Sequence, residues 1–202
     1  MKYTSIHLPA TIDDLRITDI DAVEGLLKSQ KVTDIIPNLA KLACVSDDEL
    51  TRIPIGQLKK MVTHIGNLWN GYKTSEPPQR ITLRGQRYEF IGKDIGKKQP
   101  GGWFIDAETI AKDKPEYMAA MCYIEQGMVY AERNERTNAI KNPLEDRAQV
   151  MKEELPLSVY LSLSAFFFKK FKKLETGFLW VQAVRLHKAK ELMQSQSIGS
   201  ES

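Results

Sequence analysis

Two segments of this sequence hold residue types that could do chemistry. The first is the glycine- and lysine-rich segment 92–98, which invites comparison with a phosphate-binding loop. That motif needs a glycine five positions before its Gly-Lys pair, and a Ser or Thr directly after the pair to hold magnesium. The pair here is Gly96-Lys97, but the two required positions hold Ile91 and Lys98. The spacing therefore argues against a phosphate-binding loop.

The second segment is an aromatic and basic run in the last third of the chain. Residues 155–168 are apolar at most positions, and a helix that is apolar on nearly every side must be buried in a core or against a partner. Three consecutive phenylalanines on a helix point some 100° apart, so one core does not easily bury all of them. We expect two of the three to belong to the core and one to face a partner, a neighbouring helix or a second chain. The residues predicted to bind a partner are Phe166, Phe167, Phe168, Phe171 and Trp180.

A basic cluster interrupts this apolar run, and it consists of Lys169, Lys170, Lys172 and Lys173. Lysines at the end of a helix complement the negative end of the helix dipole. The alternative is an electrostatic contact with an acidic partner or a nucleic acid. The net charge of the whole chain is only +3, from 29 basic and 26 acidic residues, which is too balanced to indicate nucleic-acid binding by itself.

The remaining reactive side chains form no recognisable catalytic or metal-binding pattern. The histidines are scattered and lack a partner at ligand spacing, and the acidic pairs are typical of solvated helix faces. Cys44 and Cys122 both lie in apolar helical patterns, so we expect buried free thiols, with a disulfide or a metal pair as the alternatives. We predict no catalytic, metal or cofactor-binding residue, and hence a protein that is not an enzyme.

Length and composition bound the fold that must position these residues. A chain of 202 residues, 42% of them hydrophobic, has room for one substantial core or two small lobes. No signal peptide opens the chain, and the apolar run is shorter than the roughly 20 residues that span a bilayer. The sequence predicts a mainly α fold with a small antiparallel β-hairpin, arranged as a helical bundle.

The first part of the chain, residues 1–72, is predicted to form an N-terminal strand or extended arm followed by a small helical unit. Helices are expected over 18–28 and 34–44, with Pro37 tolerated only in the first turn of the second. Ser46 and Glu49 match a capping box. The strongest amphipathic pattern follows, with its apolar stripe on Leu58, Met61, Val62, Ile65, Leu68 and Trp69.

The second part, residues 73–194, is predicted to hold the hairpin and a C-terminal helical bundle. A type II′ turn at Gly85-Gln86 would place Leu83 opposite Tyr88 and Ile81 opposite Phe90, on one apolar face. Helices are then expected from about residue 106, from Pro115 through Ile124, from 142 to about 154, from 156, and over 179–193. A charged connection covers 132–141, and residues 195–202 are predicted to be a frayed tail.

Three blocks of the chain together resemble small tailed-bacteriophage proteins of the tail-assembly-chaperone type. The first joins 6–9 to 12–18, and the second runs from the hairpin at 80–91 through Gly101-Gly102-Trp103 into 104–109. The third leads from 155–159 into the phenylalanines. The segment 122–141 departs from the simple helix pair expected there. The resemblance implies a non-enzymatic protein that binds a tape-measure protein or another tail protein, and it transfers no catalytic residue.

These observations lead to one main functional hypothesis and two alternatives. The main hypothesis is a tail assembly factor, in the cytoplasm of the bacterial host, that shields apolar helical segments of the tape-measure protein. The first alternative is a structural virion component, such as a head–tail connector or tail subunit that assembles as a ring of identical copies. The second is a DNA-associated regulator acting through the basic cluster.

Overall fold

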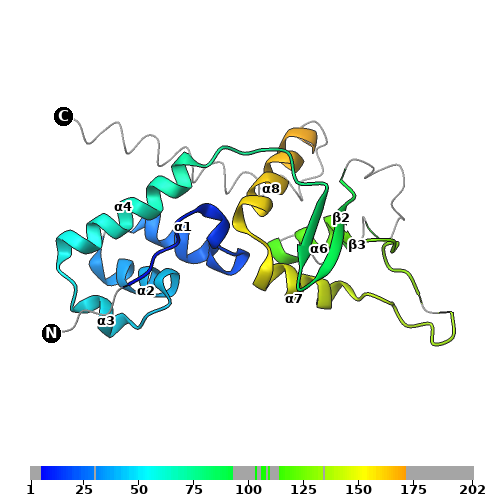
Figure 1. The fold of residues 1–202 in the computed structure, drawn as a ribbon, viewed down its shortest axis with the longest axis horizontal. Helices are drawn as coiled ribbons and strands as arrows, with labels where there is room; N and C mark the ends of the chain where they lie inside the picture. Colours follow the sequence, from blue (N-terminus) through cyan, green and yellow to red (C-terminus); the bar gives the residue numbers. More distant parts are fainter. Residues whose placement is uncertain are drawn as a thin grey trace. The chain divides into compact units, whose positions relative to one another are not determined.

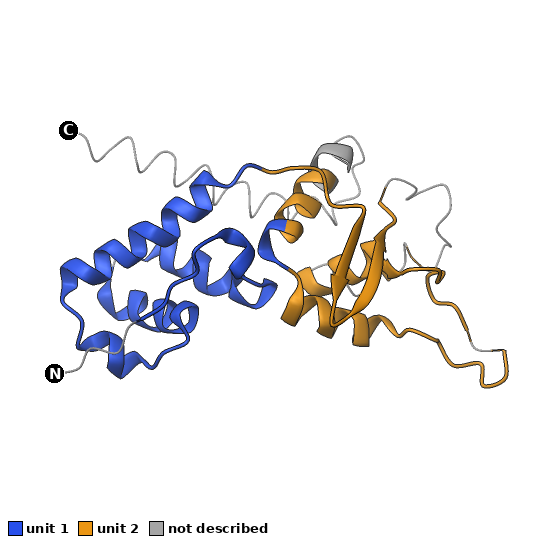
Figure 2. Cartoon of the chain, in the orientation of Figure 1, with its two compact units in different colours: residues 1–73, 156–158, 187–202 blue, residues 74–155, 159–186 orange. Residues whose placement is uncertain are grey.

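The computed structural model describes residues 6–29, 31–92, 103, 106, 107, 109, 114–133 and 135–171, with backbone only for 167–171. The described chain forms two compact units (Figures 1 and 2). The first contains the residues up to Lys73 and also Pro156–Ser158, and the second contains Thr74–Leu155 and resumes at Val159. The predicted helix over 179–193 and the predicted tail at 195–202 lie outside the described residues.

The first unit is helical. Two short 3-10 turns, η1 (Ile12–Asp14) and η2 (Ile17–Asp19), precede four helices. The helices are α1 (Ile20–Lys28), α2 (Val32–Ala43), α3 (Asp47–Thr51) and α4 (Ile55–Gly71). The predicted apolar stripe of α4 is confirmed. Leu58, Ile65 and Trp69 are buried, and the other three residues of the stripe are half-buried.

Local capping signals agree with the structure. At the start of α3, the Glu49 amide donates to the Ser46 hydroxyl (3.3 Å) and the Ser46 amide donates to the Glu49 carboxylate (3.0 Å). These bonds satisfy two amide groups that a helix start leaves unpaired. The Ser46 amide, as the main cause, and the Ser46 hydroxyl both donate to the Glu49 carboxylate and lower its pKa.

Two predictions about α2 are wrong. The helix begins at Val32 rather than at Asp34, so Pro37 lies inside it instead of in its first turn. Cys44, predicted to be buried, is exposed, because it caps the end of α2 in a left-handed conformation with φ of 53°. The apolar positions that α2 buries lie just before it, at Leu39, Ala40, Leu42 and Ala43.

A short distant segment completes the first unit. The Leu157 amide donates to the Leu15 carbonyl (2.9 Å), and Arg16 forms an antiparallel bridge with Pro156. The Tyr72 hydroxyl donates to the Ser158 carbonyl (2.7 Å). The compact unit around 1–73 therefore includes backbone from a segment that sequence proximity alone would not assign to it.

The second unit combines helices with one small sheet. Its strands, β1 (Arg80–Leu83), β2 (Gln86–Phe90) and β3 (Tyr123–Glu125), are antiparallel in the order β1-β2-β3. Its helices are α6 (Pro115–Cys122), α7 (Leu144–Glu154) and α8 (Leu157–Phe171), the first residues of which group with the first unit. The predicted fold class, mainly α with a small antiparallel β element, is confirmed.

The hairpin exists, but its predicted register is wrong. The turn is Arg84-Gly85, with φ of 49° and 77°, and it pairs Leu83 with Gln86 and Ile81 with Tyr88. Positive φ at both central positions is the type I′ geometry that matches strand twist. The observed pairing differs by two residues from the predicted one, so the apolar face is the same in both. The turn predicted at Gly85-Gln86 would have placed Arg84 opposite Arg87, whereas the observed register places Arg80 opposite Glu89, with which it forms an ion pair (3.1 Å).

Two further boundaries differ from prediction. The helix that begins at Pro115 ends at Cys122, and Ile124 lies in β3 because residues 123–125 pair with the open edge of β2. Tertiary pairing thus overrides the helical pattern. Pro143 rather than Asn142 precedes the first residue of α7.

The turn geometry predicts different effects on stability for two substitutions of Arg84. Both Arg84→Val and Arg84→Asn remove the exposed contacts that Arg84 makes with Glu153 and Glu154. Only asparagine adopts a left-handed conformation easily, so the Val variant should be less stable than the Asn variant by about 1–2 kcal/mol. Urea unfolding of the two proteins measures the difference. A more stable Val variant would instead indicate that Arg84 lies in a strand, as in the register predicted from sequence.

Candidate functional site

The predicted binding helix α8 is enclosed over its central described residues, 160–164. Five consecutive side chains, those of residues 160–164, are buried. At about 100° per residue they cover the whole circumference of the helix. Burial becomes partial at Ala165 and Phe166. The prediction that this apolar run cannot keep one face in water is therefore confirmed as far as Ser164.

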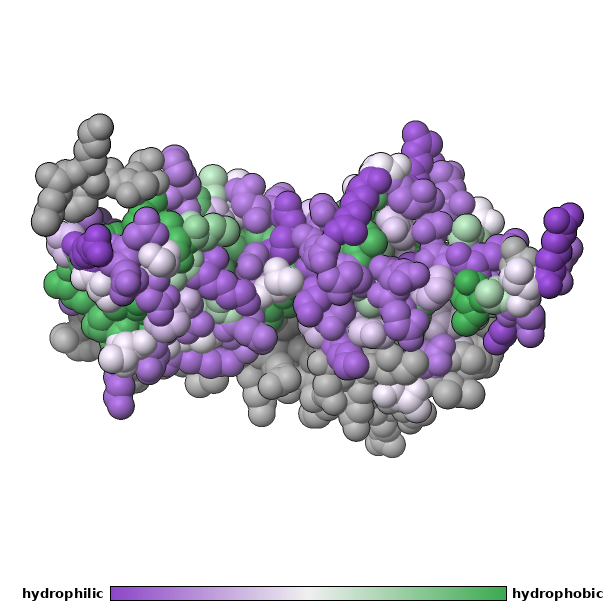
Figure 3. All heavy atoms as spheres, turned by 90° about the horizontal axis from the view of Figure 1, so that it is seen from below, coloured by the Kyte–Doolittle hydropathy of each residue, from purple (hydrophilic) through white to green (hydrophobic). Residues whose placement is uncertain are grey.

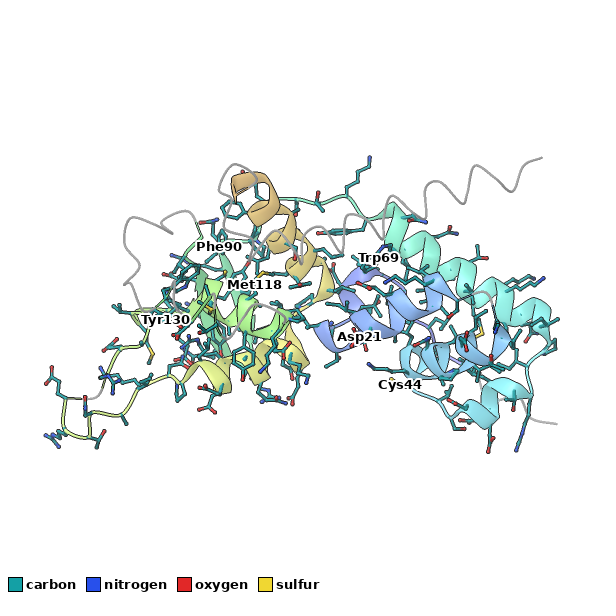
Figure 4. All side chains as sticks on the ribbon, turned by 180° about the vertical axis from the view of Figure 1, so that it is seen from behind. Asp21, Cys44, Trp69, Phe90, Met118 and Tyr130 are labelled. Atoms are coloured by element: carbon teal, nitrogen blue, oxygen red, sulfur yellow. The ribbon has the colours of Figure 1, made fainter. Side chains whose placement is uncertain are left out.

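Phe166 is the predicted partner-binding residue whose side chain is described. Its ring packs edge-on against Phe90 of β2, with centroids 5.2 Å apart, and Phe90 in turn packs against Tyr123 of β3 at 5.5 Å. The Tyr123 hydroxyl donates to the Pro78 carbonyl (3.0 Å). Burial raises the pKa of this hydroxyl. Phe166 is thus half-buried, and it contacts the sheet through Phe90, which is labelled in Figure 4.

The other predicted contacts are only partly placed. Four of these residues belong to α8 by their backbone, while their side chains lie outside the described residues: Phe167, Phe168, Lys169 and Lys170. Phe171 is the last residue of α8, and its side chain also lies outside the described residues. Lys172, Lys173 and Trp180 lie outside the described part of the chain altogether. Their roles in partner binding stay predictions.

The structure also contains a site that the sequence did not suggest, centred on Arg147 of α7. This arginine is only 3% exposed. Its Nε donates to the Ala120 carbonyl (3.2 Å), its Nη1 donates to the Asn142 carbonyl, and its guanidinium lies 5.7 Å from the centre of the Tyr130 ring. Burial lowers the pKa of this guanidinium, and nearby Tyr130 and Glu125 oppose that shift.

Arg147 belongs to a set of donors gathered around the buried C-terminal end of α6. A helix leaves its last four carbonyls without a partner inside the helix. In α6 the Ala119 carbonyl accepts from the Tyr123 amide and the Ala120 carbonyl from Arg147. The Met121 carbonyl accepts from the indole of Trp103 (2.9 Å) and the Cys122 carbonyl from the Ile91 amide (2.9 Å). All four carbonyls are therefore satisfied, the Ala119 carbonyl by the residue that follows the helix and the other three by donors from three distant segments.

A tyrosine–carboxylate pair extends this site. The hydroxyl of the buried Tyr130 donates to the Asp106 carboxylate. Burial raises the pKa of Tyr130, and the bond to Asp106 raises it further. Tyr130 consequently stays protonated at neutral pH and holds Asp106 as a hydrogen-bond acceptor. This hydrogen bond orders the chain around Tyr130.

One sequence signal could have revealed Arg147. The buried positions of α7 are Leu144, Arg147, Ala148 and Met151, which follow helical spacing. An arginine at i+3 from Leu144 falls on that apolar stripe, and a buried arginine requires specific acceptors. The acceptors themselves come from distant segments and could not be identified from the sequence.

The rest of the described surface shows few features that would mark a binding site. In the face shown in Figure 3, hydrophilic surface predominates and apolar surface forms separate patches. The large apolar side chains that are exposed among the described residues are Val32, Ile55, Val129 and Ile140. The described residues contain no cluster of three His, Cys, Asp or Glu that could hold a metal ion. Within the same part of the chain, Cys122 is buried with a free thiol, as predicted, and burial raises its pKa.

Comparisons with known proteins give no match. No protein-family model, no curated protein and no solved structure is significantly similar to this chain. A search of the described residues also finds no helix with the length and apolarity needed to cross a membrane.

The half-buried contact of Phe166 gives a quantitative expectation. Phe166→Ala removes its edge-on contact with Phe90 and should lower the free energy of unfolding by about 2 kcal/mol, less than a fully buried phenylalanine. Val129→Ala is the control, because Val129 is 64% exposed and should change stability by less than about 0.5 kcal/mol. Both are measured by urea unfolding. Equal effects for the two variants would mean that Phe166 does not pack on the sheet.

Proposed function

We propose that this protein is a non-enzymatic assembly factor of a bacteriophage tail, which binds and shields apolar helical segments of the tape-measure protein. The proposal rests on the resemblance of three sequence blocks to tail-assembly-chaperone-type proteins. Its structural support is the change in side-chain burial along α8. Its side chains are buried from Tyr160 to Ser164, and burial becomes partial at Ala165 and Phe166, where the phenylalanines begin.

An aromatic side chain at such a position suits a binding role. Aromatic residues bury much area at low entropic cost and dominate the energetics of many interfaces. A helix that is anchored in a core holds them in place before binding, which reduces the entropy lost on association. An apolar helix of a partner is a suitable ligand, since it needs cover from water until it assembles.

The decisive experiment is co-expression with a tape-measure protein, for which the candidate is a long helical open reading frame that we expect next to this gene. If the proposal is right, the soluble fraction of that protein should rise severalfold when this chain is present, and the two should co-purify. The Phe166→Ala variant should weaken the complex by about 2 kcal/mol, as expected for a hot-spot aromatic. Val129→Ala serves as the matched control and should leave the complex unchanged.

Two outcomes would contradict the proposal. A neighbouring protein that is equally soluble without this chain would exclude a shielding role. A complex that forms but stays in purified virions at fixed stoichiometry would identify a structural component instead. Thermal melts of the free variants show whether a loss of binding reflects unfolding.

A further inference from the structure

Residues 126–133 and 135–143 form the two sides of an extended arm that leaves the end of β3 and returns to the start of α7 (Figure 1). Hydrogen bonds hold its two sides together. The Lys141 amide donates to the Glu132 carbonyl (2.8 Å), and the side chains of these two residues form an ion pair. Arg133 bridges to Ile140 and donates through Nη1 to the Asn138 carbonyl (2.7 Å).

The base of the arm is fastened in a different way from its sides. On the outgoing side, Tyr130 is buried, bonds to Asp106 and lies against the guanidinium of Arg147. On the returning side, the Asn142 carbonyl accepts a hydrogen bond from the same guanidinium. One buried cation therefore contacts both ends of the arm, while its Nε bonds to the end of α6.

We propose that Arg147 is a positioning residue that clamps the base of the arm, so that the arm is held as a preformed element and is released when the clamp is broken. Arginine suits this role because its planar guanidinium carries several donors in a fixed arrangement and also stacks on an aromatic ring. Lysine offers a compact point charge and cannot reproduce that geometry. Methionine has a comparable length but no donor, and it would leave two carbonyls without their partner.

The clamp has a consequence for the surface of the arm. Val129 is 64% exposed and Ile140 is 38% exposed, one on each side of the arm. Because both sides of the arm are fixed at Arg147, Val129 and Ile140 are held in defined places. The arm therefore has less conformational entropy to lose when these side chains bind another molecule. The inference concerns the free protein and does not depend on the proposed function.

Amide hydrogen exchange on the full-length protein tests the clamp. Arg147→Met should speed exchange at the Glu132 and Lys141 amides by about tenfold or more, the effect expected from losing hydrogen bonds to a charged group. Arg147→Lys should restore only part of the protection. Arg52→Met, which removes an exposed arginine in the first unit, is the control and should leave the arm unchanged.

A second variant covers the case in which Arg147→Met unfolds the second unit. Tyr130→Leu removes the stacked ring and the bond to Asp106 without touching α6. It should speed exchange in the arm while the amides of α7 keep their protection. The proposal is overturned if the arm keeps wild-type exchange rates in folded Arg147→Met or in Tyr130→Leu. It is equally overturned if the arm amides of the wild-type protein already exchange at the rate of an unstructured peptide.

Discussion

A helix that ends among buried side chains must find partners for its last four carbonyls, because water cannot reach them. Helix α6 faces this constraint in full, since Met121, Cys122 and Tyr123 are all almost completely buried. Each unpaired buried carbonyl would cost about 1–3 kcal/mol. The second unit meets the constraint with the amide of Tyr123, directly after the helix, and with donors from three segments that lie farther away in sequence.

Much of the architecture of the second unit follows from this arrangement. The Ile91 amide brings the end of β2 to the end of α6, and the chain leaving α6 at once pairs with the same strand as β3. Arg147 brings α7 to the same place and fastens the arm, while the Trp103 indole adds a further segment. The cationic guanidinium of Arg147 also suits the negative C-terminal end of the α6 dipole. A buried arginine is costly unless acceptors satisfy its donors, and here the Nε of Arg147 supplies the partner that the Ala120 carbonyl at the end of α6 lacks.

The sequence predicted the features that depend on neighbouring residues. The capping box at Ser46, the apolar stripe of α4 and the enclosure of α8 all follow from local spacing, and each agrees with the structure. The hairpin register failed because two pairings that differ by two residues place the same side chains on the apolar face. Only the turn geometry and the cross-strand charges distinguish them. Helical periodicity likewise could not predict that Ile124 pairs with β2.

The two candidate sites also differ in how far they could be predicted from neighbouring residues. The aromatic run was evident from composition, and the packing of Phe166 on Phe90 adds the sheet as its support. The site around Arg147 was missed because its acceptors are backbone carbonyls, which every residue carries and no sequence pattern marks. A binding role for α8 and a clamping role for Arg147 are compatible, since one concerns the helix that presents aromatic residues and the other concerns the arm.

The central claim is that the buried end of α6 holds the second unit together. The most direct measurement is native-state hydrogen exchange of the Ile91 amide across a series of low denaturant concentrations. If the claim is right, this amide exchanges only when the whole unit unfolds, with the same free energy and the same denaturant dependence as the amides at the centre of α6. Exchange of Ile91 through a local opening, at much lower free energy and with little dependence on denaturant, would contradict it.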